Sequence, residues 1–187
     1  DITDLIIDII GVNDAPELDV PETPLITVED TDLTITEISV EDVDSQPTGI
    51  NNFNLDFEIT VEKGTLSLSS NTGAMNYSVG DGTEDVSMIF STTISNFNNA
   101  LSGSTFHPEE NYYGTEGKII ISVNDTGNNG IQNDGDPVEL TDTETINIEI
   151  TNDNDAPIIT ASESYTIDED EDNFYLTDIE LSDQDVA

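Results

Sequence analysis

The stretch FNLDFEITV, residues 53–61, decides the fold class. Apolar and polar side chains alternate strictly along it, and Ile146, Ile148 and Ile150 alternate in the same way with their polar neighbours. A period of two residues is typical of a β-strand with one face buried and the other in water. This pattern outweighs the high charge, which by itself would favour a disordered chain.

Further strands are expected in short segments that Gly, Asn and Asp separate from one another. These segments are residues 25–28, 33–40 with a phase slip near Glu37, 65–68, 86–90, 104–106 and 118–123. Residues 93–101 have apolar side chains at a helical spacing, with Ser95 as a candidate N-cap. Seven or eight short strands with such turns predict an all-β sandwich.

The charge balance excludes several classes of partner. The 187 residues include 42 Asp and Glu, 2 Lys and no Arg, which gives a net charge of −40. Contacts with phosphate need cations, so nucleic acid and an anionic membrane surface are excluded. No apolar run approaches the roughly 18 residues that span a bilayer, so no membrane insertion is expected. With no Cys and one His, the chain has few groups for catalysis, and we expect no enzyme.

The sequence repeats internally. NDAP occurs at residues 13–16 and again at 154–157, an offset in numbering of 154 − 13 = 141, and the same offset relates residues 33–40 to 174–181. A period of this length suits a whole β-sandwich domain rather than a solenoid turn. We therefore expect the last strand of one repeat in residues 1–14, a complete repeat in 15–156, and the first strands of the next in 157–187.

Carboxylate and amide oxygens concentrate at the repeat boundaries. Residues 152–155 alternate Asn and Asp before Ala156 and Pro157, Asp42 and Asp44 end an extended segment, and Asp125 ends another. Ca²⁺ takes six to eight hard oxygen ligands in flexible geometry, so a linker and two loop tips can supply a complete shell. A solvated acidic surface is the competing explanation. It accounts for the abundance of acidic residues but not for their placement.

These residues resemble the cadherin-like tandem repeats of large bacterial surface adhesins. The resemblance rests on Glu29, on the Asp-x-Asp of Asp42 and Asp44, on the NDAP linker and on residues 98–108. It implies a Greek-key β-sandwich of the cadherin/immunoglobulin type and one to three Ca²⁺ ions at each junction. At the first junction, the implied ligands are Asn13, Asp14, Asp42, Asp44, Asn51 and Asp125. At the second, they are Glu29, Asp153, Asn154, Asp155, Asp183 and Asp185.

The expected function is that of an extracellular, calcium-binding structural repeat that rigidifies a long surface adhesin or filament and so supports cell adhesion. Its partners would be neighbouring repeats, other copies in a filament, and a surface glycan or protein target. An extracellular location follows because extracellular modules bind Ca²⁺ with dissociation constants of about 10⁻⁴–10⁻³ M. The alternative is a carbohydrate-binding module in which Tyr112 and Tyr113 stack on sugar. His107 is expected to be a packed or surface residue rather than a ligand.

Overall fold

The computed structural model describes residues 12–45, 53–70, 75–127, 138–170 and 172–185. The chain divides into two compact units, unit 1 (Asp1–Thr151) and unit 2 (Asn152–Ala187). Unit 1 is an all-β sandwich with one short helix, which confirms the predicted fold class. The strand expected in residues 1–14 falls almost entirely outside the described residues.

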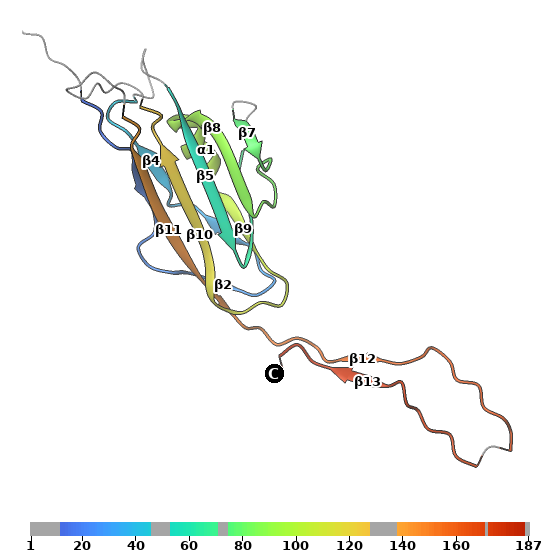
Figure 1. Ribbon diagram of the computed structural model, residues 1–187. Helices are drawn as coiled ribbons and strands as arrows, with labels where there is room; N and C mark the ends of the chain where they lie inside the picture. The colour runs from blue at the N-terminus through green and yellow to red at the C-terminus, as the bar shows by residue number, and fades with distance from the viewer. Residues whose placement is uncertain (1–11, 46–52, 71–74, 128–137, 171, 186–187) are drawn as a thin grey trace, which may run out of the picture. The chain divides into compact units, whose positions relative to one another are not determined.

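One layer of unit 1 is a six-stranded sheet with the order β2-β11-β10-β5-β8-β7 (Figure 1). Its strands are β2 (Leu25–Val28), β5 (Asn54–Glu62), β7 (Asn76–Val79), β8 (Ser87–Thr93), β10 (Gly114–Asn124) and β11 (Thr141–Thr151). Neighbouring strands are antiparallel except β2, which runs parallel to β11. The long strands β5, β10 and β11 lie side by side within this sheet.

The other layer contains two smaller sheets. One is β3 (Leu33–Ile35), β9 (Ser104–Pro108) and β6 (Gly64–Ser67), in the order β3-β9-β6. The second pairs β1 (Glu17–Asp19) with β4 (Ser39–Glu41), and we call this pair the opening ribbon of unit 1. The predicted strand 33–40 is thus two strands, because the chain leaves β3 after Ile35 and pairs with a different partner from Ser39.

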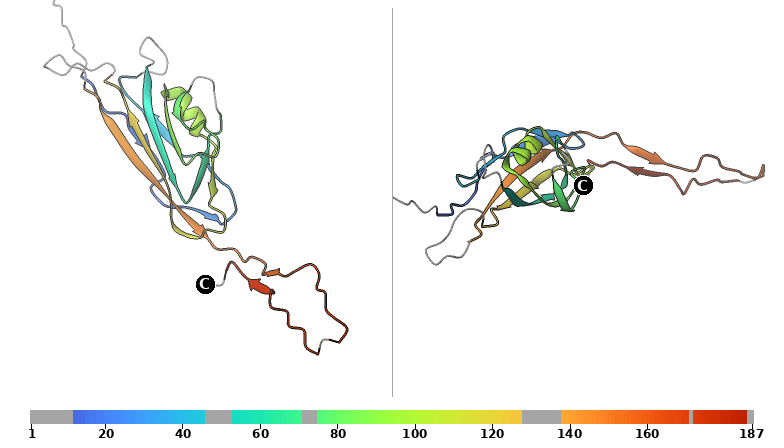
Figure 2. Two further views of the ribbon diagram at one scale, coloured as in Figure 1. Left: turned by 45° about the vertical axis from the view of Figure 1, so that its right-hand side comes forward. Right: turned by 90° about the horizontal axis from the view of Figure 1, so that it is seen from above.

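The core lies between the two layers. Leu55, Phe57 and Ile59 of β5 are each at most 1% exposed, as the alternating pattern predicted. The helix α1 (Ile94–Leu101) closes one side of the core (Figure 2). The Phe97 ring of α1 stacks on the Phe57 ring with centroids 4.0 Å apart.

The N-cap of α1 is Thr93, so the choice of Ser95 was wrong. Thr93 has extended backbone angles, and its side-chain oxygen accepts a hydrogen bond from the Asn96 N–H. Ser95 already lies in the first helical turn, where its side chain cannot cap the free N–H groups. Among the described residues, no helix is long and apolar enough to cross a membrane.

Unit 2 contains one short antiparallel pair, β12 (Ile158–Thr160) and β13 (Glu180–Ser182). Ile159 pairs with Leu181, just as Leu18 pairs with Val40 in the opening ribbon of unit 1. Both partners are shifted by the same offset that separates the two NDAP motifs. We call β12 and β13 the opening ribbon of unit 2.

Candidate metal centre

The predicted ligands of unit 1 that lie among the described residues are found at its two opposite ends. At the start of β11, the Asp125 N–H donates to the Leu140 carbonyl, and at the end of β11 the Glu29 N–H donates to the Thr151 carbonyl. The 11 residues of β11 extend about 35 Å at the usual rise of a strand. Asp125 and Glu29 therefore cannot share one ion within unit 1.

The opening ribbon brings predicted ligands together at the Asp125 end. Asp14 precedes β1 and Asp44 follows β4, and the Asp14 N–H donates to Asp44 Oδ2 at 2.7 Å. Asp42 Oδ1 accepts from the N–H groups of Asp44, at 2.7 Å, and Ser45, at 3.1 Å. These bonds fold the Asp-x-Asp segment into a tight turn, in the way Asp side chains commonly do.

Asn13 connects this turn to the rest of unit 1. We call this remainder, which consists of the six-stranded sheet, the β3-β9-β6 sheet and α1, the body of unit 1. Its Nδ2 donates to Asp125 Oδ2 at 2.5 Å and to the Val138 carbonyl at 2.9 Å. The other oxygen of Asp125, Oδ1, accepts from the Gly127 and Leu140 N–H groups, each at 2.8 Å. Asn13, Asp14, Asp42, Asp44 and Asp125 therefore form one group of side chains, which we call the carboxylate cluster.

Two buried polar atoms at the carboxylate cluster have no hydrogen-bond partner among the described residues. They are Asn13 Oδ1 and Ser45 Oγ. Asn13 is 5% exposed and Ser45 is 4% exposed. The Asn13 amide orientation is fixed, because both neighbours of its Nδ2 are acceptors. An unsatisfied buried polar atom costs about 1–3 kcal/mol, so a further partner for Asn13 Oδ1 is expected.

The electrostatics of the carboxylate cluster are unfavourable without a cation. Burial raises the pKa of the Asp42 carboxyl above its ordinary value of 3.8, and the charges of Asp44 and Asp125 act in the same direction. The backbone donors from Asp44 and Ser45 lower this pKa but do not outweigh burial. Protonation is one way to relieve such a site, and a bound cation is the other.

The basic side chains of the protein are engaged elsewhere. Lys63 Nζ lies 3.9 Å from Glu109, and Lys118 Nζ lies 3.0 Å from Glu62. The one His, His107, contacts Asp32 through Nδ1 at 2.7 Å. Neutralisation of the carboxylate cluster by a basic side chain is therefore not available within the described residues.

Unit 2 repeats the turn of the carboxylate cluster. The Asp155 N–H donates to Asp185 Oδ2 at 2.6 Å, and the Asp185 N–H donates to Asp183 Oδ1 at 3.0 Å. These are the equivalents of the Asp14, Asp44 and Asp42 bonds, each shifted by the offset between the NDAP motifs. Asp153 Oδ1 accepts from the Asn154 N–H, at 3.0 Å, within the same linker.

One described predicted ligand of unit 1 lies apart from the carboxylate cluster. Glu29 is 5% exposed and lies at the far end of unit 1 from the carboxylate cluster. Asn51 lies outside the described residues. Sequence reasoning missed Ser45, whose only signal was its place directly after the Asp-x-Asp segment.

Two residues outside the cluster bear on the alternative functions. His107 lies on β9 and is half-buried. Its Nδ1 contacts Asp32, just before β3, and its Nε2 faces Ser67 Oγ of β6 at 3.0 Å. The imidazole therefore links the strands of the β3-β9-β6 sheet. Lys63 Nζ lies 4.7 Å from the centroid of the Tyr112 ring. One face of that ring is therefore covered, which leaves it less suited to stacking on sugar.

Comparison of the sequence with models of known protein families, and with characterised proteins, found no match.

Proposed function

We propose that the carboxylate cluster binds Ca²⁺ and that unit 1 is a calcium-dependent structural repeat of an extracellular, adhesin-like protein. The observation that carries this proposal is the buried Asn13 Oδ1, which lacks a hydrogen-bond partner among the described residues. It belongs to a side chain bonded to the buried carboxylate of Asp125. A cation would satisfy this oxygen and offset the charge of the neighbouring carboxylates.

The ligand chemistry favours calcium over other common metals. The cluster consists of carboxylate and amide oxygens with no His or Cys, and such oxygens suit hard cations rather than zinc. Mg²⁺ demands near-ideal octahedral geometry and gives up its water reluctantly. Ca²⁺ accepts six to eight oxygens in irregular arrangements, such as side chains from three separate chain segments.

The mechanism that follows is mechanical. Asn13 and Asp14 lie just before β1, Asp42 and Asp44 follow β4, and Asp125 follows β10. An ion held by all three segments would fix the segment before β1 against the rest of unit 1, whereas without it the carboxylates repel one another. An ion present at 100 times its dissociation constant stabilises the folded state by about 2.7 kcal/mol.

The repetition in unit 2 supports a tandem array. Asp155, Asp183 and Asp185 form the same turn as their counterparts Asp14, Asp42 and Asp44, as the start of a following repeat would. Consecutive repeats joined by calcium would form a stiff rod that projects from a cell surface or builds a filament. Dissociation constants of about 10⁻⁴–10⁻³ M would suit the millimolar calcium found outside cells.

Thermal unfolding followed by circular dichroism tests the proposal. The chain is heated in calcium, in magnesium and in chelator at matched ionic strength, and calcium alone is expected to raise Tm by about 5–10 °C. The variant Asp125→Asn should lose most of this increase. Its control, Asp56→Asn on the exposed face of β5, should keep it.

If calcium and magnesium raise Tm by the same small amount, the acidic residues are only surface charge and the proposal is overturned. The rod itself is tested by X-ray scattering from a protein of two joined repeats. The distribution of distances within this protein should be narrower in calcium than in chelator.

A further inference from the structure

The opening ribbon of unit 1 depends on the rest of the unit for its position. Its strands β1 and β4 have three residues each, and an isolated pair of strands is marginally stable at best in water. The ribbon nevertheless carries Asn13 and Asp14 before β1, and Asp42 and Asp44 after β4. Asp125 lies outside the ribbon, at the end of β10. The geometry of the carboxylate cluster is therefore set by whatever holds the ribbon to the body.

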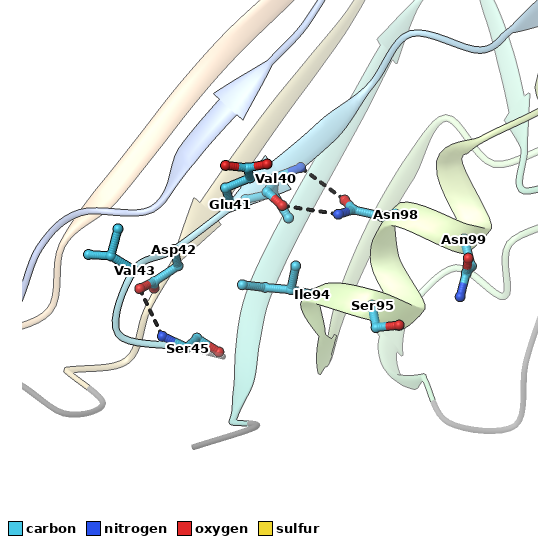
Figure 3. Close-up of a pocket in the computed structure, with 9 residues that line it drawn as sticks. All are labelled: Val40, Glu41, Asp42, Val43, Ser45, Ile94, Ser95, Asn98 and Asn99. Atoms are coloured by element: carbon cyan, nitrogen blue, oxygen red, sulfur yellow. Dashed lines mark hydrogen bonds between the residues drawn. The ribbon is translucent and has the colours of Figure 1, made fainter. Parts of the chain in front are cut away.

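The side chain of Asn98 on α1 bonds to the β4 strand of this ribbon. The Val40 N–H donates to Asn98 Oδ1 at 2.9 Å, and Asn98 Nδ2 donates to the Val40 carbonyl at 3.0 Å (Figure 3). The Asn98 amide thus pairs with both backbone groups of Val40, as a third strand would. Val40 is fully buried, so loss of these bonds would leave two backbone groups without partners.

The opposite strand is held in a similar way. The Leu18 N–H donates to Asp142 Oδ2, on β11, at 2.8 Å. Leu18 and Val40 are register partners, so the ribbon is anchored on both sides at the same level. Asp142 is charged and would also act on a cation through its field, whereas Asn98 is neutral. An effect of Asn98 on the cluster must therefore act through position.

The end of β4 beside Asp42 is not closely packed against α1. A pocket of about 420 Å³ lies between this end and α1, lined by Val40, Asp42, Ile94 and Asn98 among others. Within the described residues, the strand therefore has room to shift toward the helix if the amide bonds are removed. Asp42 comes two residues after Val40, so such a shift would move its carboxylate directly.

We propose that Asn98 is a positioning residue that sets the calcium affinity of the carboxylate cluster by fixing β4, and with it Asp42 and Asp44. The proposal rests on the calcium site proposed above. It adds an uncharged determinant whose side-chain hydrogen bonds, among the described residues, go to Val40 rather than to a proposed ligand. Groups that orient metal ligands from outside the ligand set commonly change affinity by about 10–100-fold.

The test uses the full chain and a site-specific readout. The amide NMR signals of Asp44 and Gly127 are followed during calcium titration, because these N–H groups bond to the Asp42 and Asp125 carboxylates. Asn98→Ala is expected to raise the calcium concentration at half-saturation about tenfold. The control Asn99→Ala alters the next residue on α1, which also lines the pocket, and should leave the half-saturation point unchanged.

Asn98→Asp separates position from charge. It keeps an acceptor for the Val40 N–H but removes the donor to the Val40 carbonyl, and it adds a negative charge. Added charge alone would tighten calcium binding, whereas loss of position weakens it, and the proposal predicts weaker binding. This variant preserves the shape of the side chain and leaves no cavity, and its folding is checked by thermal unfolding in chelator.

The outcomes are distinguishable. If both Asn98 variants bind calcium as tightly as the wild type while their stability in chelator falls, Asn98 has a merely structural role and the inference is overturned. If the wild-type signals show no saturable response to calcium, the proposed function fails instead. Thermal unfolding in chelator accompanies each titration, so that a loss of folding is recognised as such.

Discussion

The opening ribbons of the two units have the same local geometry in different surroundings. Leu18 and Val40 in unit 1 are 6% and 0% exposed, whereas their counterparts Ile159 and Leu181 in unit 2 are 70% and 67% exposed. Register and the N–H to carboxylate bonds are nevertheless the same in both. The Asp-x-Asp turn and the strand pairing are therefore specified locally, while burial depends on contacts with distant segments.

The ribbon and the body of unit 1 therefore contribute different features of the carboxylate cluster. The ribbon carries most of the proposed ligand oxygens, and its local sequence forms the Asp-x-Asp turn. The body of unit 1 supplies Asp125, the Asn98 and Asp142 anchors, and the burial that makes the unsatisfied Asn13 Oδ1 costly. On this account, the carboxylate cluster, which includes Asp125, binds calcium more tightly than the turn formed by Asp155, Asp183 and Asp185 in unit 2.

The largest expected difference between the ribbons is in the cost of removing an apolar side chain. Leu18→Ala should lower the free energy of unfolding by about 2–5 kcal/mol, because it leaves a cavity in a packed core. Ile159→Ala, at the equivalent exposed position, should change it by no more than about 0.5 kcal/mol. Urea unfolding followed by circular dichroism measures both. Similar losses for the two variants would show that unit 2 has a packed core of its own.

Removal of the Asp-x-Asp charge should have effects of opposite sign with and without calcium. In chelator, Asp42→Asn should stabilise unit 1, because it removes a buried carboxylate whose pKa is raised by burial and by neighbouring charges. In calcium at 100 times the dissociation constant, the variant should lack about 2.7 kcal/mol of ion-derived stability.

The matched control is Asp183→Asn, the equivalent change in unit 2. It should leave the unfolding of unit 1 unchanged in both conditions, as differential scanning calorimetry would show. Destabilisation by Asp42→Asn in chelator would mean that the Asp42 charge is already compensated within the protein.

A smaller effect is expected from pH in the absence of calcium. The folded-state pKa of Asp42 lies above its ordinary value of 3.8, so the folded protein binds this proton more tightly than the unfolded chain. The contribution of Asp42 to stability is therefore fully present below pH 3.8 and is lost as the pH rises through the folded-state pKa.

The stability difference between the wild type and Asp42→Asn isolates this contribution. In chelator, the wild type should become progressively less stable relative to Asp42→Asn as the pH rises from 3.8 through the folded-state pKa of Asp42. In calcium, the dependence should reverse, because the ion binds the ionised carboxylate. A difference that does not vary with pH would contradict the position assigned to Asp42.

The sequence was sufficient for features that arise from local patterns. Alternation along β5 and β11 predicted the buried faces, and Asp42 and Asp44 were recognised as a pair of carboxylates that ends an extended segment. The strands β1 and β7 were missed because neither has an alternating run of buried apolar residues: β1 has one buried side chain, Leu18, and β7 has none. Their pairing is decided by the partners β4 and β8.

Long-range contacts account for the rest. The link between Asn98 and Val40 joins residues 58 positions apart, and nothing in the local sequence of either residue indicates it. The choice of Thr93 over Ser95 as the N-cap depends on where β8 ends. That the Asp125 carboxylate reaches Asn13 depends on the pairing of β10 with β11, which brings strand ends together across the sandwich.

The most direct test of the central claim is a calcium titration of the full chain, followed by the amide NMR signals of Asp14, Asp44 and Gly127. The account predicts that these three signals shift together and saturate with one dissociation constant, and that magnesium at the same concentration does not reproduce the shifts. If the three signals shift linearly without saturation, and equally with magnesium, the carboxylate cluster is not a calcium site.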